Sequence, residues 1–376
     1  MDCPHRPPCP GCPRFGEPGI VPAVLDALVA LARSQGLPRP RVVEGAGTGY
    51  RHRARLAVRG RATSPKIGIF QEDSHRITDI PRCVVHHPLV NAVAAAVKTA
   101  VRRTGVTLYG DRSHRGFLRY LQVVVERASE SAQVVLVGND ESHRALDATA
   151  DVVRAELGAR LHSLWWNGNT TSTNAILGPR WHRWTGPETT VETIGGARVF
   201  YPPGAFGQSN LPLADRLVAL VHAWVPPGAR VLEMHAGVGA IGLGLVARGH
   251  EVVFNEVSRW SLVGLNLGLD ALGADARRRT RVLRGPAAEH LRAIDDADVV
   301  VCDPPRRGLE APLLARLAAD PPPTLVLVSC NPDAFLIEAR TLLAGRRMRL
   351  AQLVTFALFP YTDHVETVGL FEGGPG

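Results

Sequence analysis

Short apolar runs alternate with helical segments from about residue 205 onward, and this alternation constrains the fold more than any other feature. Strands are predicted at 230–235, 251–255, 280–283, 298–302 and 324–329, each followed by a helical pattern. Such an alternation predicts an α/β domain with a Rossmann-like parallel sheet and helices on both faces. Residues 349–356 and 366–371 are expected as an antiparallel strand pair at the edge of that sheet.

The first 204 residues lack this alternation and look like a mixed α+β region. Apolar residues recur at helical spacing over 21–36, and a second helix is predicted at 91–102. Two strands are predicted at 118–125 and 132–137. We therefore divide the chain into three parts, which are a Cys-rich segment with a helix at 1–40, a basic α+β domain at 41–204 and the α/β domain at 205–376.

The charge balance indicates a polyanionic partner. The chain carries 43 Lys and Arg against 35 Asp and Glu, a net charge of +8. Residues 41–66 hold seven basic side chains and one acid, Glu44, and Arg112, Arg115 and Arg119 lie around the start of a predicted strand. A basic, arginine-rich face favours nucleic acid, although each of these arginines could also belong to a solvated surface.

Cysteines gather at the N-terminus. Cys3, Cys9 and Cys12 lie within twelve residues of each other, and Cys83 follows in the basic domain. Four thiolates suit either Zn²⁺ or a [4Fe–4S] cluster, and the spacing leaves both open. His5, His86 and His87 are alternative zinc ligands. The N-terminus lacks a secretory signal and the chain has no run of 18 apolar residues, so we expect a cytoplasmic protein without a membrane helix.

A glycine-rich turn follows the first strand of the α/β domain. It runs from Glu233 through Gly237 and Gly239, and the next strand ends at Glu256. Glycines at this position let the backbone approach a ligand, and a carboxylate after the second strand can accept ribose hydroxyls. The pattern indicates a nucleoside-containing cofactor, with a plain tight turn and a solvated strand end as the alternatives.

Two further strands end in chemically active residues. Asp303-Pro304-Pro305-Arg306 follows one of them, and Ser329-Cys330-Asn331-Pro332 follows the next. Asp-Pro-Pro at this place is typical of S-adenosylmethionine enzymes that act on planar bases, with the carboxylate facing an N–H edge. Cys330 is placed to act as a nucleophile, whereas Cys302 is interpreted as an inert core residue.

These motifs, together with Phe206-Gly207-Gln208-Ser209-Asn210 and the block from Phe359 to Glu366, occur in the order seen in RNA uracil-5-methyltransferases. The chain resembles that family over nearly its whole length. It is most similar to the short 23S rRNA enzymes that lack an N-terminal TRAM domain. The resemblance implies a class I methyltransferase fold, S-adenosylmethionine as cofactor, and a [4Fe–4S] cluster on the four cysteines, with zinc as the alternative. It also implies RNA binding, a role in rRNA processing and a monomer.

The resemblance also implies residue roles. Cys330 would add to carbon 6 of uracil and Glu366 would remove the proton from carbon 5. We expect the Cys330 thiol to ionise more easily than a free cysteine, whose pKa is about 8.5. Substrate contacts fall on Phe206, Gln208, Asp303 and Arg306, and cofactor contacts on Gln208, Glu233, Gly237, Gly239, Glu256 and Asp303.

Four positions depart from the family pattern: His235 replaces an aromatic residue, Ala236 a cysteine, and Pro286 and Ala357 each an aspartate. They leave two alternatives to an rRNA enzyme. One is the same reaction on tRNA, and the other is a non-catalytic RNA-binding or ribosome-assembly factor built on a decayed methyltransferase. A cytosine-5-methyltransferase is disfavoured, because its usual Pro-Cys pair is replaced here by Cys302-Asp303.

Overall fold

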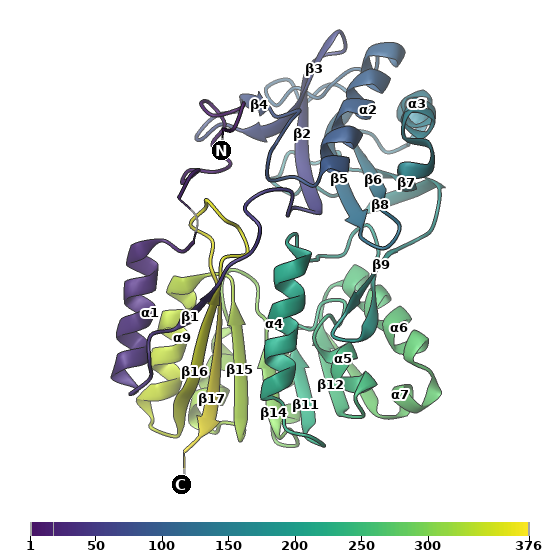
Figure 1. Ribbon diagram of the computed structural model, residues 1–376. Coiled ribbons are helices and arrows are strands. Elements are labelled where there is room, and N and C mark those ends of the chain that lie inside the picture. The colour runs from purple at the N-terminus through teal and green to yellow at the C-terminus, as the bar shows by residue number, and fades with distance from the viewer. Residues whose placement is uncertain (1, 18, 375–376) are drawn as a thin grey trace.

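The computed structural model describes residues 2–17 and 19–374, which build two large β-sheets arranged one above the other (Figure 1) and one two-stranded sheet. The upper sheet has seven strands in the order β4-β3-β2-β5-β6-β7-β8. Their bounds are β2 Arg53–Arg61, β3 Ser64–Phe70, β4 Ile77–Asp79, β5 Leu118–Glu126, β6 Ser131–Gly138, β7 Leu161–Gly168 and β8 Arg180–Thr185. All neighbouring strands are antiparallel except β6 and β7, which run parallel.

Helices α2 (Pro88–Thr104) and α3 (Asp147–Leu157) cover one face of this sheet. Their apolar side chains share a core with alternate residues of β2, β5, β6 and β7. Helix α2 begins at a proline and ends before Gly105, whose φ of 67° few other residues adopt. Two short 3₁₀ turns, Arg144–Leu146 and Gly158–Arg160, flank α3.

The lower sheet has eight strands in the order β1-β16-β17-β15-β14-β11-β12-β13. Their bounds are β1 Arg41–Val43, β11 Arg230–Met234, β12 Glu251–Glu256, β13 Thr280–Arg284, β14 Val299–Cys302, β15 Thr324–Ser329, β16 Met348–Phe356 and β17 Glu366–Gly373. The run from β15 to β13 is parallel, and β17 is antiparallel to both of its neighbours. The predicted α/β class is confirmed.

Helices cover both faces of the lower sheet. Side chains of α4 (Leu211–Trp224), α5 (Gly242–Ala247) and α6 (Arg259–Leu272) share one core with it. Those of α1 (Pro22–Ser34), α8 (Ala311–Ala319) and α9 (Pro332–Ala344) share another. The hairpin of β9 (Thr190–Ile194) and β10 (Ala197–Tyr201) lies beside α6, and α7 (Ala274–Arg278) follows α6.

Three features of the lower half differ from the sequence-based expectation. The antiparallel pair β16–β17 exists, but it is not at the edge, because β17 lies between β15 and β16. The strand at that edge is β1, which comes from the region assigned to the basic domain. Its Val43 is buried and pairs with Phe356 of β16. The helix expected near 287–294 is two 3₁₀ turns, Ala287–Glu289 and Leu291–Ile294.

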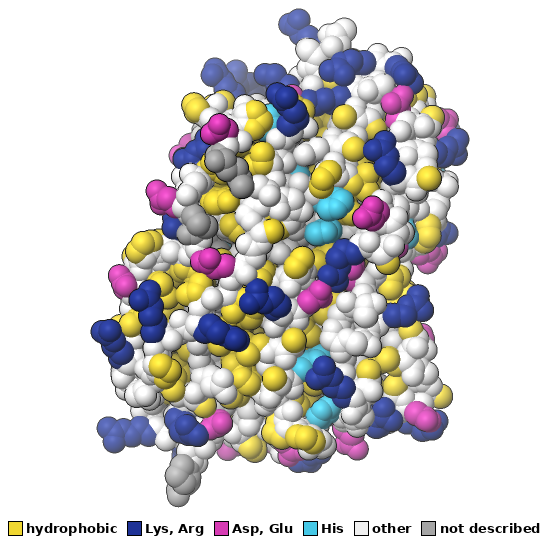
Figure 2. Space-filling model, in the orientation of Figure 1, with side chains coloured by type: hydrophobic (Ala, Val, Ile, Leu, Met, Phe, Trp, Pro, Cys, Tyr) yellow, Lys and Arg dark blue, Asp and Glu magenta, His cyan; other side chains and the backbone are white. Residues whose placement is uncertain are grey.

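Basic side chains lie along the top of the molecule in the view of Figure 2 and are also scattered over the lower half. Within the described residues, no helix is long and apolar enough to cross a membrane.

Candidate active site

The carboxyl edge of the lower sheet brings three predicted residues together. Asp303 follows β14, Cys330 follows β15 and Glu366 begins β17. Ser329 pairs with Thr367 in the β15–β17 ladder, so Cys330 and Glu366 are neighbours across adjacent strands. Strand β14 pairs with β15, so Asp303 follows the strand next to the one that leads to Cys330. The charges of Glu366 and Asp303 accordingly both raise the pKa of the Cys330 thiol.

The two carboxyl groups of this cluster favour their protonated forms. Glu366 is only 2% exposed. Burial raises the pKa of Asp303 to about 7. Burial first and the charge of Asp303 second raise the pKa of Glu366 well above its ordinary value. Two carboxylates this close cannot both ionise easily, so the pair retains a proton toward neutral pH.

The Cys330 thiol is harder to ionise than a free cysteine. Burial first, and the charges of Glu366 and Asp303 second, raise its pKa to about 11, whereas Arg306 acts in the opposite direction. The expectation of an easily ionised thiol is therefore wrong for the unliganded protein. The reason is that burial of the sulfur and the charges of two nearby acids raise the pKa by more than the one nearby guanidinium lowers it.

Arg306 and His364 link the loops around Cys330. Nη2 of Arg306 lies 2.8 Å from Nε2 of His364. The side chain of Asn331 donates a hydrogen bond of 3.0 Å to the main-chain oxygen of Arg306. Asn331 also accepts from the amide of Asp333 at the start of α9. The segments after β14, after β15 and before β17 are thus joined on one side of the thiol.

The glycine loop lies next to this cluster, after β11. Gly237 and Gly239 have φ of 59° and 81°, and a Cβ at Gly237 would meet nothing within 4 Å. Glu256 accepts hydrogen bonds from the amides of Gly237 (2.7 Å) and Ser258 (2.6 Å). Its carboxylate therefore fixes the loop from the end of β12.

Glu233, by contrast, is turned into the protein. It is buried, and its Oε2 accepts from the amide of Gly242 at the start of α5 (3.0 Å). Burial raises its pKa well above the ordinary value. Glu233 therefore lies on the buried side of the glycine loop, where it holds the start of α5. It does not lie on the solvent side of the loop.

Phe206 and Gln208 lie in the loop between β10 and α4, which residues of the upper sheet hold in place. The Phe206 side chain is 68% exposed. Arg53 donates to the main-chain oxygen of Ala205 (2.6 Å), and Gln122 donates to that of Pro203 (2.7 Å). No local sequence pattern indicates these two anchors, and the basic stretch that contains Arg53 predicts RNA contacts instead.

Several of the basic residues expected at an RNA surface are buried. Arg119 is 3% exposed, donates to the main-chain oxygen of Thr171 (2.8 Å) and lies over the ring of Tyr109. Arg59 is also buried and pairs with Asp111. The prediction that Arg119 contacts RNA is therefore wrong, because its guanidinium is buried in contacts within the upper half. Arg112 and Arg115 are exposed.

The four predicted cysteine ligands line one cavity of about 60 Å³, beside His5 and His86. Burial raises the pKa of Cys12 to about 11, and the other three thiols contribute to that shift. Over residues 2–17 and 19–374, however, no group of three or more His, Cys, Asp or Glu side chains is arranged to hold a metal ion. His87 lies at the start of α2 instead.

The cysteine-rich segment also contacts the block that precedes Glu366. The amide of Arg14 donates to the main-chain oxygen of Tyr361 (3.0 Å), and the rings of Phe15 and Tyr361 lie 5.1 Å apart. Arg51, which lines the cysteine cavity, lies over the ring of Phe359. The cavity therefore adjoins the segment that leads into the active cluster.

Residues 194–372 match the sequence model of the family described as tRNA (Uracil-5-)-methyltransferase. An uncharacterized RNA methyltransferase of Protochlamydia amoebophila is 33% identical over 380 residues, covering 99% of this chain and 97% of the relative. Another, from Geobacter sulfurreducens, is 31% identical and covers 85% of this chain and 65% of the relative.

A solved structure is similar over most of the chain. It is the tRNA (uracil-54, C5)-methyltransferase of Pyrococcus abyssi in complex with S-adenosyl-L-homocysteine. Its TM-score is 0.79 at 25% sequence identity, covering 96% of this chain and 84% of that one.

Proposed function

Because this chain belongs to the family of S-adenosylmethionine-dependent RNA uracil-5-methyltransferases, we propose that it forms 5-methyluridine in 23S rRNA. The observation that carries the proposal is that Asp303, Cys330 and Glu366 end or begin adjacent strands at the carboxyl edge of the lower sheet. A nucleophile, an acid facing a base edge and a second acid are the groups that this reaction requires.

In the proposed mechanism, Sγ of Cys330 forms a bond to carbon 6 of uracil, and the electron pair of the carbon 5–carbon 6 double bond moves toward the carbonyl at carbon 4. S-adenosylmethionine supplies the methyl group as a sulfonium. Carbon 5 would take that methyl group as the methyl–sulfur bond breaks and S-adenosylhomocysteine leaves, and Glu366 would then accept the carbon 5 proton. The double bond re-forms as the carbon–sulfur bond breaks, which returns the thiolate, so the sequence is redox-neutral.

The ionisation state of the cluster decides when the thiol can react. Asp303 and Glu366 oppose the thiolate when charged, and Arg306 favours it. We propose that Cys330 reacts as the thiolate while the carboxyl pair holds one proton, and that this proton lies on Asp303, so that Glu366 can accept the proton from carbon 5. Asp303 then presents an oxygen to the uracil edge, and Arg306, Phe206 and Gln208 position the substrate.

The residues around the glycine loop fit a cofactor that contains adenosine. Both ring nitrogens of His235 are buried without a hydrogen-bond partner among the described residues. Val257, next to Glu256, is 66% exposed and offers an apolar surface to an adenine ring. We propose that Gly237, Gly239, Glu256, Gln208 and Asp303 contact the cofactor, and that Glu233 supports this site from behind.

We propose that Cys3, Cys9, Cys12 and Cys83 bind a [4Fe–4S] cluster, with Zn²⁺ as the alternative. Four thiols around one cavity supply a suitable donor set for either, and methyl transfer itself needs no electron. Iron, sulfide and zinc are to be quantified in protein purified without oxygen. Cys83→Ser is expected to lose the metal and Cys302→Ser to retain it. Equal metal content in the two variants would remove this assignment.

The choice of 23S rRNA rests on the similarity to the short, cysteine-bearing rRNA enzymes, and tRNA is the second candidate because of the Pyrococcus abyssi neighbour. We also propose that the enzyme acts as a monomer in the cytoplasm, with the domain division 1–40, 41–204 and 205–376. In this division, strand β1 belongs to the 41–204 domain by sequence but pairs in the sheet of the 205–376 domain.

The test is nucleoside mass spectrometry of 23S rRNA and tRNA from cells lacking the gene. Loss of 5-methyluridine from 23S rRNA is expected. The wild-type gene and a Cys302→Ala control are expected to restore it, and Cys330→Ala is not. Loss from tRNA alone would move the substrate to tRNA. Unchanged 5-methyluridine in both pools would favour the non-catalytic RNA-binding factor.

A further inference from the structure

Three tryptophans connect the upper sheet to the lower half. Trp165 of β7 and Trp181 of β8 have ring centroids 6.4 Å apart with an angle of 80° between their planes. Trp181 and Trp260 of α6 have centroids 5.0 Å apart at 67°. We refer to Trp165, Trp181 and Trp260 as the tryptophan row.

The tryptophan row leads toward the loop that carries Phe206. Strand β8 is an edge of the upper sheet, and Trp165 and Trp181 belong to a small cluster separate from the core beneath α2 and α3. At the other end, a Cβ on Gly204 would lie 2.3 Å from Cδ1 of Trp260. Trp260 therefore packs directly on the loop, two residues before the exposed Phe206 ring.

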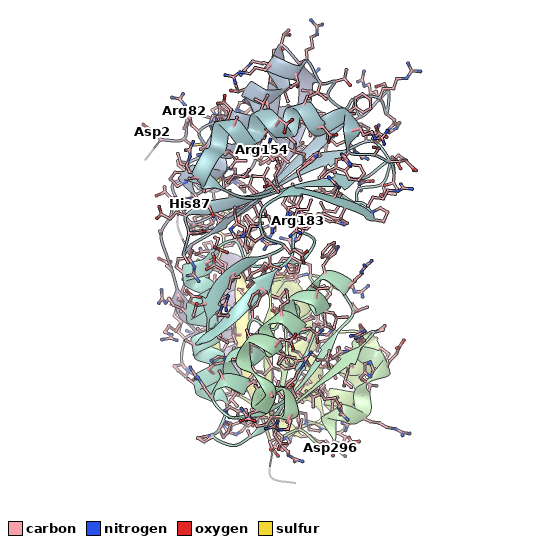
Figure 3. All side chains as sticks on the ribbon, turned by 90° about the vertical axis from the view of Figure 1, so that its right-hand side faces the viewer. Asp2, Arg82, His87, Arg154, Arg183 and Asp296 are labelled. Carbon is pink, nitrogen blue, oxygen red and sulfur yellow. The ribbon has the colours of Figure 1, made fainter. Side chains whose placement is uncertain are left out.

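Arginines accompany the row. Arg183 is the cross-strand partner of Trp165, and its guanidinium lies 5.5 Å from the centre of that ring. Figure 3 labels Arg183 at the junction of the upper and lower halves. Its ion pair with Glu188 is 3.3 Å long and exposed, so the pair holds the guanidinium only weakly. Arg259, next to Trp260, is exposed.

The geometry leaves ring surface available for a third partner. In a near-perpendicular aromatic pair, the edge of one ring meets the face of the other, so the pair covers only one of four ring faces. Trp181 and Trp260 are only partly buried. Aromatic rings with open faces beside arginines are the surface on which unpaired bases stack.

We propose that the tryptophan row is a stacking surface for unpaired nucleotides next to the target uracil. The inference rests on the proposed function, because methylation at carbon 5 requires the uracil to leave its stack. Extrusion costs a few kcal/mol and leaves the neighbouring bases without a stacking partner. Trp181 and Trp260 replace that partner, and Arg183 and Arg259 neutralise the adjacent phosphates.

The test compares Trp181→Leu and Trp260→Leu with Trp184→Leu, which changes the same strand on the face toward α3. Leucine keeps apolar volume for packing but removes the ring face. Affinity is to be measured by fluorescence anisotropy for a short fluorescein-labelled oligoadenylate and for an abasic strand of equal length, with S-adenosylhomocysteine present. Thermal unfolding of each variant reports whether it is folded.

Trp181→Leu and Trp260→Leu are expected to weaken oligoadenylate binding roughly tenfold and to leave abasic-strand binding unchanged. Trp184→Leu is expected to change neither. Trp181→Phe, which restores a ring, is expected to recover most of the loss. An equal loss of affinity for the oligoadenylate and the abasic strand would show that the tryptophan row only packs the two halves together. A lowered melting temperature with unchanged affinity would show the same. If the wild-type protein binds neither strand nor rRNA, the proposed function itself fails.

Discussion

The guanidinium of Arg53 donates a hydrogen bond of 2.6 Å to the main-chain oxygen of Ala205, a residue 152 positions later in the chain. Arg53 is buried, lies over the ring of Tyr201 and has no carboxylate within salt-bridge distance among the described residues. Arg53 therefore anchors the loop that carries Phe206 and Gln208 to the upper sheet. A buried cation without a counterion costs free energy, and we infer that this contact is kept because it positions the loop.

Arg53→Met is expected to lower kcat/KM for RNA roughly tenfold to a hundredfold, because a substrate displaced by about an ångström reacts that much more slowly. Its unfolding free energy is expected to change little, since methionine fills similar apolar volume and removes a buried charge. Steady-state kinetics with rRNA and thermal unfolding provide the two measurements. Arg33→Met, at an exposed position of α1, is the matched control, and equal activity in both variants would contradict the positioning role.

Glu366→Gln is expected to stop the reaction after methyl transfer, because glutamine cannot accept the carbon 5 proton. The Cys330–RNA bond then persists, and a protein–RNA adduct that resists denaturing electrophoresis accumulates when S-adenosylmethionine is added. Cys330→Ala, alone or combined with Glu366→Gln, is expected to give no adduct. An adduct in the alanine variant would mean that another residue is the nucleophile.

The reactivity of Cys330 is expected to report its raised pKa of about 11. Alkylation of the free enzyme by iodoacetamide, followed at the Cys330 peptide by mass spectrometry, should still be rising above pH 9. A thiol of ordinary pKa, about 8.5, approaches its plateau there. Glu366→Gln removes a charge that opposes the thiolate and should speed alkylation at a given pH, and Arg306→Gln should slow it. The reverse order would exclude this electrostatic arrangement.

The raised pKa of Glu366 also predicts a stability change with pH. Because the folded protein holds this proton more tightly than the unfolded chain, where the pKa is about 4.3, folding loses free energy as the pH rises from that value through the folded pKa. Glu366→Gln avoids the loss. It should melt at least about 2 °C above wild type at pH 8 and equal it near pH 4. A difference that does not depend on pH would argue against a buried acid.

The sequence predicts the lower half well, because each strand and helix there is a separate local pattern. The strand predicted at 324–329 matches β15 without a shift, and the strand predicted at 280–283 matches β13 to within one residue. Strand order is not local: nothing in 41–43 indicates pairing with β16. The motifs identify Cys330, Asp303 and Glu366. The anchors at Arg53 and Gln122 and the tryptophan row depend on how the two sheets face each other, which no local pattern encodes.

The position of β1 affects how the chain folds during synthesis. Strands β2 to β8 are contiguous in sequence, so the upper sheet can form as soon as residue 185 is available. Strand β1 precedes all of them, yet its partner β16 is made more than 300 residues later. Until then its backbone edge and Val43 remain unpaired on the nascent chain, a state prone to aggregation. The upper sheet, which carries Trp165 and Trp181, can thus be complete well before the sheet that carries Cys330, so methylation competence is the last property the chain acquires.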